Sequence, residues 1–161
     1  MARNEVIVGV DPGLKGAIIL MDTKSGALLS AYPLPEDVLA LYKLLFVTKQ
    51  KYPSLIVACE KAQTIPGRQS VKGAFTSGRN FGALQACIKL LYVPSQFIPP
   101  VTWQAELHKG ADGNGPKEKS LNVAKNLWPC ETFTFHEKQK KPQDGIVDAM
   151  LIAEFLRRRL K

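Results

Sequence analysis

The sequence predicts an α/β protein with a mixed β-sheet, on two observations. Three short apolar segments with strand-like composition follow one another near the N-terminus with only tight turns between them, which indicates an antiparallel meander. A segment with helical periodicity then leads to a fourth, fully apolar strand over residues 55–59. A strand–helix–strand connection favours parallel pairing of this strand with the first. The 161 residues suit one compact domain over 1–161, because no repeat or linker divides them.

The meander is predicted to place its strands over residues 5–10, 17–21 and 27–32. Its first turn reads Asp11, Pro12, Gly13. That turn is tight because proline fixes φ and glycine permits a positive φ. Apolar residues then recur at helical spacing from Val38, and this helix is expected to end before Pro53.

The remaining chain alternates between helices and loops. A loop is expected over 61–72, which carries proline, glycine and basic residues without an apolar period. Further helices are predicted over 74–92, 101–107, 117–127 and 143–160, and a short fifth strand over 96–98. Pro116 opens the third of these helices, since proline suits a first helical position. The polar, basic segment 129–142 is expected to be mobile.

The net charge of +8 favours a polyanionic partner, of which nucleic acid is the usual one. Charge that serves solubility alone is the alternative. Three cysteines without a CxxC pair indicate a reduced, cytoplasmic protein. We expect no signal or transit peptide at the N-terminus, and no apolar run is long enough to span a membrane.

Four acidic residues occupy positions that are typical of a catalytic or metal-binding site. Asp11 directly follows the first strand and Glu60 the fourth. If these strands are adjacent and parallel, both acids emerge at the carboxyl edge of the sheet, where open α/β sheets bind ligands. Asp144 and Asp148 lie four residues apart, on one face of the last predicted helix. That helix is apolar nearly all round, so we expect it to be buried.

Buried acids need a positive partner, because uncompensated buried charge costs several kcal/mol. Residues 144–155 contain no lysine or arginine, which favours a bound cation. Carboxylates and water are the ligands of Mg²⁺, and two such ions form a clamp for phosphodiester hydrolysis. Three of the acids also have a structural alternative: a turn residue for Asp11, a surface acid for Glu60 and a first-turn acid for Asp144. Asp148 is hard to explain structurally, because it lies one turn inside an apolar helix. The hypothesis of a metal site therefore rests on the four acids taken together and not on any one of them.

Four blocks of this sequence resemble the RuvC family of Holliday-junction resolvases, within the RNase H-like superfamily. They are GVDPG at residues 9–13, LIVACE ending at Glu60, FTSGRNFGALQACIKLLYVPSQFIPPVTWQ and DGIVDAMLIAEF. The third block is similar to phage and organellar RuvC-like proteins, and the resemblance covers nearly the whole chain. It implies a single RNase H-like nuclease domain with a five-stranded mixed sheet in the order 3-2-1-4-5, flanked by helices.

The resemblance also implies an activity. The family consists of homodimers that bind four-way DNA junctions and nick two strands symmetrically with Mg²⁺ or Mn²⁺, in DNA recombination and repair. Its catalytic, metal-binding acids fall here on Asp11, Glu60, Asp144 and Asp148. Bacterial members space the last two positions three apart, which would fall on Gly145, whereas plastid members share the spacing of four found here. The family's aromatic wedge has no counterpart directly after Glu60.

Five basic residues are candidates for contacts with DNA phosphates: Arg68, Lys72, Arg79, Lys117 and Lys119. A plain solvated face is the alternative for each. Gly78 and Gly82 share one face of a predicted helix, which fits either a dimer contact or a contact within the chain. An RNase H acting on RNA–DNA hybrids and an inactive nucleic-acid-binding module on the same fold remain the rival functions.

Overall fold

The computed structural model describes residues 5–63 and 70–160. Its elements in chain order are β1 (Val6–Asp11), β2 (Ala17–Asp22), β3 (Leu28–Pro33), α1 (Val38–Lys51), β4 (Ile56–Glu60), α2 (Val71–Leu90), β5 (Ser95–Ile98), α3 (Pro100–Leu107), α4 (Pro116–Leu127) and α5 (Asp144–Arg159). Most predicted elements are present, with ends shifted by one or two residues.

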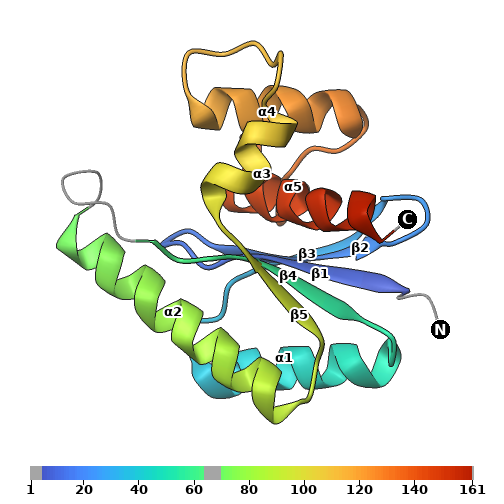
Figure 1. Cartoon of the computed structure of the whole chain (residues 1–161), viewed down its shortest axis with the longest axis vertical. Coiled ribbons are helices and arrows are strands. Elements are labelled where there is room, and N and C mark those ends of the chain that lie inside the picture. The colour runs from blue at the N-terminus through green and yellow to red at the C-terminus, as the bar shows by residue number, and fades with distance from the viewer. Residues whose placement is uncertain (1–4, 64–69, 161) are drawn as a thin grey trace.

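The five strands form one mixed sheet in the order β3-β2-β1-β4-β5, as the resemblance implies. β1 pairs antiparallel with β2, and β2 with β3, which confirms the predicted meander. β4 lies parallel to β1, and β5 parallel to β4, so the crossover through α1 is confirmed too. The helices divide between the two faces: α1 and α2 cover one, and α5 covers the other, with α3 and α4 packed around it (Figure 1).

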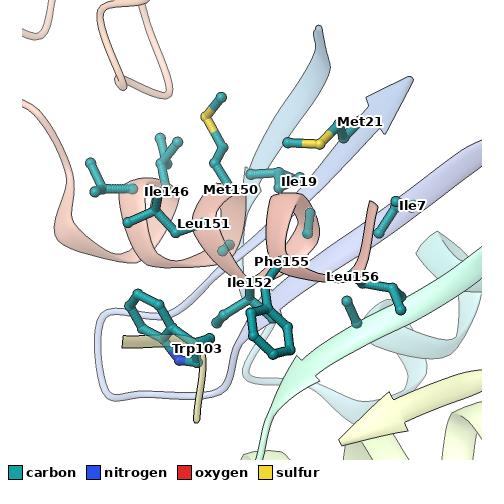
Figure 2. Close-up of a cluster of buried hydrophobic side chains, with 14 of the residues drawn as sticks. Ile7, Ile19, Met21, Trp103, Ile146, Met150, Leu151, Ile152, Phe155 and Leu156 are labelled. Carbon is teal, nitrogen blue, oxygen red and sulfur yellow. The ribbon is translucent and has the colours of Figure 1, made fainter. Parts of the chain in front are cut away.

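Strand alternation divides the core into two clusters. Along β1, Val6, Val8 and Val10 face α1 and α2, whereas Ile7 points to the α5 face. The α5 side holds the larger cluster, because this helix is buried along almost its whole length, as predicted. Figure 2 shows Ile146, Met150 and other α5 side chains packed against β1, β2 and α3.

Two glycines let α5 lie close to the sheet. A Cβ on Gly9 of β1 would overlap the carbonyl oxygen of Ala149 in α5. A Cβ on Gly145, in the first turn of α5, would overlap the carbonyl oxygen of Lys15 between β1 and β2. Both contacts are between backbones, which cannot yield as a flexible side chain does. The lack of a side chain at Gly9 and Gly145 therefore sets how closely α5 approaches the sheet and where its N-terminal end lies.

The prediction for the first of the two long loops needs correction. The loop expected over 61–72 is too long, because α2 already begins at Val71, where the Ser70 side chain accepts a hydrogen bond from the Gly73 N–H and caps the helix. The rest of that loop, 64–69, lies outside the described residues. The segment 129–142 contains no helix or strand, yet Phe133 is buried in the α5-side cluster and anchors it. The polar composition of the segment gave no indication that Phe133 would be buried.

Within residues 5–63 and 70–160, no helix is both long and apolar enough to cross a membrane. All three cysteines are free, with Cys59 and Cys87 buried and Cys130 exposed.

Gly9→Ala should destabilise the fold by about 1–3 kcal/mol, because the added methyl group overpacks the β1–α5 contact. Gly78→Ala is the matched control. It lies in α2 with no atom within 4 Å of the added Cβ, so it should stabilise the protein by about 0.5–1 kcal/mol. Urea unfolding at low protein concentration measures both. Equal effects of the two substitutions would contradict the close approach of α5.

Candidate active site

Asp11 and Glu60 leave the sheet at the same edge and on the same face. β1 and β4 are adjacent and parallel, with Val10 paired with Cys59, so the next residues of the two strands are Asp11 and Glu60. Alternation turns Ile7, Gly9 and Asp11 of β1 toward α5. The same alternation applies to Glu60, since Ile56 and Ala58 of β4 belong to the α5-side cluster.

Asp148 joins these two acids from α5. It precedes Ala149, whose carbonyl oxygen lies against Gly9, and Gly9 is two residues from Asp11 on the same face. Asp148 is half-buried and interacts electrostatically with both Asp11 and Glu60. Asp144 begins α5 one turn earlier and is exposed, and its charge also acts on Asp11 and Asp148. The four predicted acids therefore lie in one neighbourhood, three of them half-buried.

Burial dominates the electrostatics of this neighbourhood. It raises the pKa of Glu60 to about 7, with a further contribution from the Asp11 charge. It raises the pKa of Asp148 to about 8, again with help from Asp11. The pKa of Asp11 is raised for the same reason, although the Gly13 N–H donates a hydrogen bond of 2.9 Å to its carboxylate and partly opposes the shift. Each carboxylate therefore disfavours the charge of the others.

One lysine reaches the acids. Lys117, the second residue of α4, donates a hydrogen bond of 2.7 Å from Nζ to Asp144. This contact raises the pKa of Lys117, to which the Asp148 and Asp11 charges also contribute. Among the residues that the structure describes, no lysine or arginine forms an ion pair with Asp11, Glu60 or Asp148. The positive partner expected from the sequence is therefore present for the exposed Asp144, as Lys117. Within the same residues, the three half-buried acids have no such partner.

Two neutral side chains that the sequence did not single out contact the acids. Trp103 of α3 donates its indole N–H to Glu60 Oε2 at 2.9 Å. Ser120 of α4 is buried and hydrogen-bonded to Asp148, and its hydroxyl lies 3.1 Å from His108 Nε2. When Asp148 is ionised it can only accept, so the serine hydroxyl then donates to Asp148 and the serine oxygen accepts from the His108 N–H. A buried tryptophan needs a hydrogen-bond partner for its N–H. This need was the only feature of the sequence that could have indicated a polar contact of Trp103.

A cleft of about 420 Å³ opens beside Asp11 and Glu60. Lys117 lines it on one side. The first turns of α2 line it on the other through Ser70, Gly73 and Ser77. The acids therefore face a space that is open to a ligand and bordered by a positive charge and a helix N-terminus, both of which attract phosphate.

The donor set suits a hard divalent cation. Carboxylate oxygens are the ligands that Mg²⁺ and Mn²⁺ prefer. Three carboxylates with raised pKa, without an ion-pair partner among residues 5–63 and 70–160, are stabilised by added positive charge. In the described part of the chain, however, no group of three or more His, Cys, Asp or Glu residues is arranged closely enough to hold a metal ion. The acids lie near one another without forming a closed set of ligands.

The predicted DNA-contacting residues fall into two groups. Lys72 and Arg79 are exposed on α2, seven residues and so about two turns apart on one side of the helix. Lys117 and Lys119 lie in the first turn of α4, where Lys117 is exposed and Lys119 half-buried. Arg68 lies outside the described residues. Of the four described candidates, Lys117 lines the cleft beside Asp11 and Glu60, and the other three lie on the two helices whose first turns border it.

The exposed side of α2 also carries Gly78 and Gly82. A Cβ added to either glycine would meet no atom of residues 5–63 and 70–160 within 4 Å, so neither glycine makes a close contact with that part of the chain. Phe75 is exposed on the same helix, with 71% of its surface accessible. Phe81 is half-buried instead and packs edge-to-face on Phe97, with ring centroids 5.3 Å apart. Of these two phenylalanines, only Phe75 is placed to meet a ligand.

Two solved structures of Thermus thermophilus RuvC are similar to this chain. The first aligns with a TM-score of 0.58 and 19% identity over 93% of this chain and 91% of that one. The second, RuvC in complex with a Holliday junction substrate, aligns with a TM-score of 0.64 and 19% identity over 94% and 92%. At this identity the likeness establishes the fold alone, and the predicted five-stranded mixed sheet flanked by helices is confirmed. The sequence itself matches no family model and no curated protein.

Without bound metal, the protein should become less stable as pH rises. Glu60 and Asp148 hold their protons more tightly in the folded chain, with pKa about 7 and about 8, than at their ordinary values of 4.5 and 3.8. Unfolding therefore releases protons, and the free energy of unfolding falls as pH rises through this range. Thermal unfolding in a chelator should show Glu60→Gln and Asp148→Asn gaining stability over the wild type with increasing pH.

Asp22→Asn is the control for this measurement. Hydrogen bonds from Ser25 lower the pKa of Asp22, so its effect on stability lies below the pH range in question. Its difference from the wild type should stay constant between about pH 5 and 9. A constant difference for Glu60→Gln as well would contradict the picture of uncompensated buried acids.

Proposed function

We propose that this protein is a Mg²⁺-dependent endonuclease that resolves four-way DNA junctions by paired, symmetric nicks. The observation that carries the proposal is the convergence of Asp11, Glu60 and Asp148, from three separate elements, on one face of an RNase H-like sheet. The likeness to a RuvC structure solved with its Holliday junction substrate supports branched DNA as the ligand. The basic composition agrees with a polyanionic substrate.

The catalytic residues of this proposal are Asp11, Glu60, Asp144 and Asp148, which would bind two Mg²⁺ or Mn²⁺ ions. Such ions supply a nucleophilic water at neutral pH and stabilise the leaving oxygen of a phosphodiester. The four carboxylates would hold the ions at the edge of the sheet, beside the cleft. Lys117 has two roles open to it, because its exposed ammonium group can pair with Asp144 or with a DNA phosphate that enters the cleft.

The DNA would lie along the N-terminal turns of α2 and α4. Lys72, Arg79, Lys117 and Lys119 would contact its phosphates, and Arg68 belongs to the same proposal. Contacts of this kind position a duplex arm without reading its sequence. The exposed Phe75 lies between Lys72 and Arg79 on α2, where an aromatic side chain can stack on an unpaired base.

A second copy of the chain would pair through the exposed side of α2. Gly78 and Gly82 lie one turn apart there and leave open space in which another backbone can approach. Two active sites related by a twofold axis match the symmetry of a four-way junction, and this is why symmetric nicks are expected of a homodimer. With its three free cysteines, the protein would work in a reducing compartment such as the cytoplasm, in DNA recombination and repair.

Asp11→Asn should abolish cutting and leave junction binding largely intact. The substitution removes a carboxylate of the proposed metal site, and loss of even an indirect partner of a metal ligand costs about 10–100-fold. We therefore expect a loss of at least about 100-fold in the cleavage rate of a synthetic four-way junction. Asp22→Asn, at the opposite end of the sheet, is the matched control and should cut at the wild-type rate.

The same assay separates the rival functions. The substrates are the junction, a plain duplex and an RNA–DNA hybrid, each with and without Mg²⁺. Paired symmetric nicks in the junction alone support the proposal. Preferential cutting of the hybrid would favour an RNase H, and binding without any cutting would favour an inactive module. Near wild-type cutting by Asp11→Asn would reject the metal assignment.

Removal of two phosphate contacts should flatten the salt dependence of junction binding. Lys72→Gln with Arg79→Gln should lower the slope of log K against log salt concentration by about 2, because each contact contributes about 0.9. The control double substitution, Lys24→Gln with Lys51→Gln, removes equal charge at the opposite end of the sheet from Asp11 and Glu60. Lys24 follows β2, and Lys51 is the last residue of α1. It should leave the slope nearly unchanged. An equal effect of both pairs would reduce the α2 contacts to a general charge effect.

A further inference from the structure

Trp103 is fully buried and contacts a proposed metal ligand. None of its surface is accessible, and Figure 2 shows it beside Ile152 and Phe155 of α5. Its indole nitrogen donates to Glu60 Oε2 at 2.9 Å. An indole N–H is a donor only and carries no charge, so it can stabilise an ionised carboxylate without competing with a cation for it. The hydrogen bond occupies one oxygen of Glu60 and leaves the other to the site.

The backbone delivers the indole to this oxygen with little freedom. Glu60 pairs with Ile98 at the last position of the β4–β5 ladder, and the Lys61 N–H donates to the Ile98 carbonyl at 2.9 Å. Pro99 and Pro100 follow, and both have restricted φ. α3 begins at Pro100, so Trp103 stands in its first turn. Two prolines and one helical turn therefore connect the strand beside Glu60 to the side chain that binds Glu60.

The second tryptophan of the chain shows that a buried indole needs no acid. Trp128 donates its N–H to the backbone carbonyl of Gly26 at 2.8 Å, in a half-buried position. A neutral carbonyl satisfies that indole without any role for a charged group. Trp103 instead takes a carboxylate that is itself half-buried and lies beside Asp11. Packing alone requires a partner for the indole but does not require this one.

We propose that Trp103 is a positioning residue for Glu60: its indole N–H fixes one carboxylate oxygen so that the other is presented to a divalent cation. The inference rests on the proposed function, since it takes Glu60 as a metal ligand. Partners that orient metal ligands typically contribute 10–100-fold to metal affinity. Without this hydrogen bond, Glu60 keeps its charge and its place on β4 but loses its fixed orientation.

Trp103→Phe tests the proposal, because phenylalanine retains an aromatic ring and lacks the N–H. Trp128→Phe is the matched control, since it also removes one indole hydrogen bond from the same protein. Calorimetric titration of the metal-free proteins with Mn²⁺ should show affinity about 10-fold weaker for Trp103→Phe and nearly unchanged for Trp128→Phe. In junction cleavage, the half-saturating Mn²⁺ concentration should rise by the same factor, while the rate at saturating Mn²⁺ falls less.

A second measurement keeps the native indole in place. In the Trp128→Phe protein, Trp103 is the sole tryptophan, since the chain has two. Mg²⁺ should change its fluorescence saturably, because a cation at Glu60 alters the field on the hydrogen-bonded indole. Adding Glu60→Gln to this protein should remove the response. This test holds even if Trp103→Phe fails to fold.

The outcomes separate this inference from the proposed function. If the wild-type protein binds no Mn²⁺, the metal assignment fails and the role of Trp103 fails with it. If the wild type binds Mn²⁺ and a folded Trp103→Phe protein binds it equally well, the positioning role alone is overturned. A Trp103 emission that ignores Mg²⁺ while Mn²⁺ binds also overturns it. Weaker binding by Trp103→Phe and Trp128→Phe to the same extent shows a general loss of packing and overturns it as well.

Discussion

The close contact between Gly9 of β1 and Ala149 of α5 is the constraint on which this site depends. Strand alternation places Asp11 on the face of β1 that carries Gly9, and Asp148 directly precedes Ala149 on the helix. A side chain at residue 9 would push the helix away and separate the two acids. Because residue 9 has no side chain, Asp148 of α5 comes close enough to Asp11 of β1 for the Asp11 charge to raise the pKa of Asp148.

The electrostatic consequence is a site that is unfavourable by itself. Burial and repulsion between the acids raise the pKa of Asp11, Glu60 and Asp148. Hydrogen bonds from Gly13, Trp103 and Ser120 oppose this shift, and at Asp11 the Lys117 charge opposes it too. Neutral donors can orient a carboxylate but cannot cancel its charge. The apolar surface of α5 supplies the stability that allows such a cluster to persist. The arrangement is therefore stabilised further by whatever brings positive charge into the cleft.

The sequence predicted the parts of this structure that depend on short-range patterns. The meander, the crossover and the buried last helix follow from turns and periodicity, and the convergence of Asp11 with Glu60 follows from parallel strands. The contacts of Trp103 and Lys117 could not be predicted, because each depends on the register of distant elements. Glu60 and Trp103 are 43 residues apart, and Lys117 and Asp144 are 27 apart. The early start of α2 was missed because Ser70 and Lys72 carry no apolar signal.

The start of α5 explains why its first acid stands at residue 144. A spacing of three from Asp148 would require a side chain at residue 145, where the backbone of Lys15 already fills the space. One position earlier, Asp144 emerges into solvent, with 60% of its side chain exposed, and meets Lys117 of α4. An exposed ion pair of this kind contributes about 0–1 kcal/mol, so little free energy holds it closed. Asp144 can therefore exchange Lys117 for a cation, and Lys117 can exchange Asp144 for a phosphate, at the edge of the same cleft.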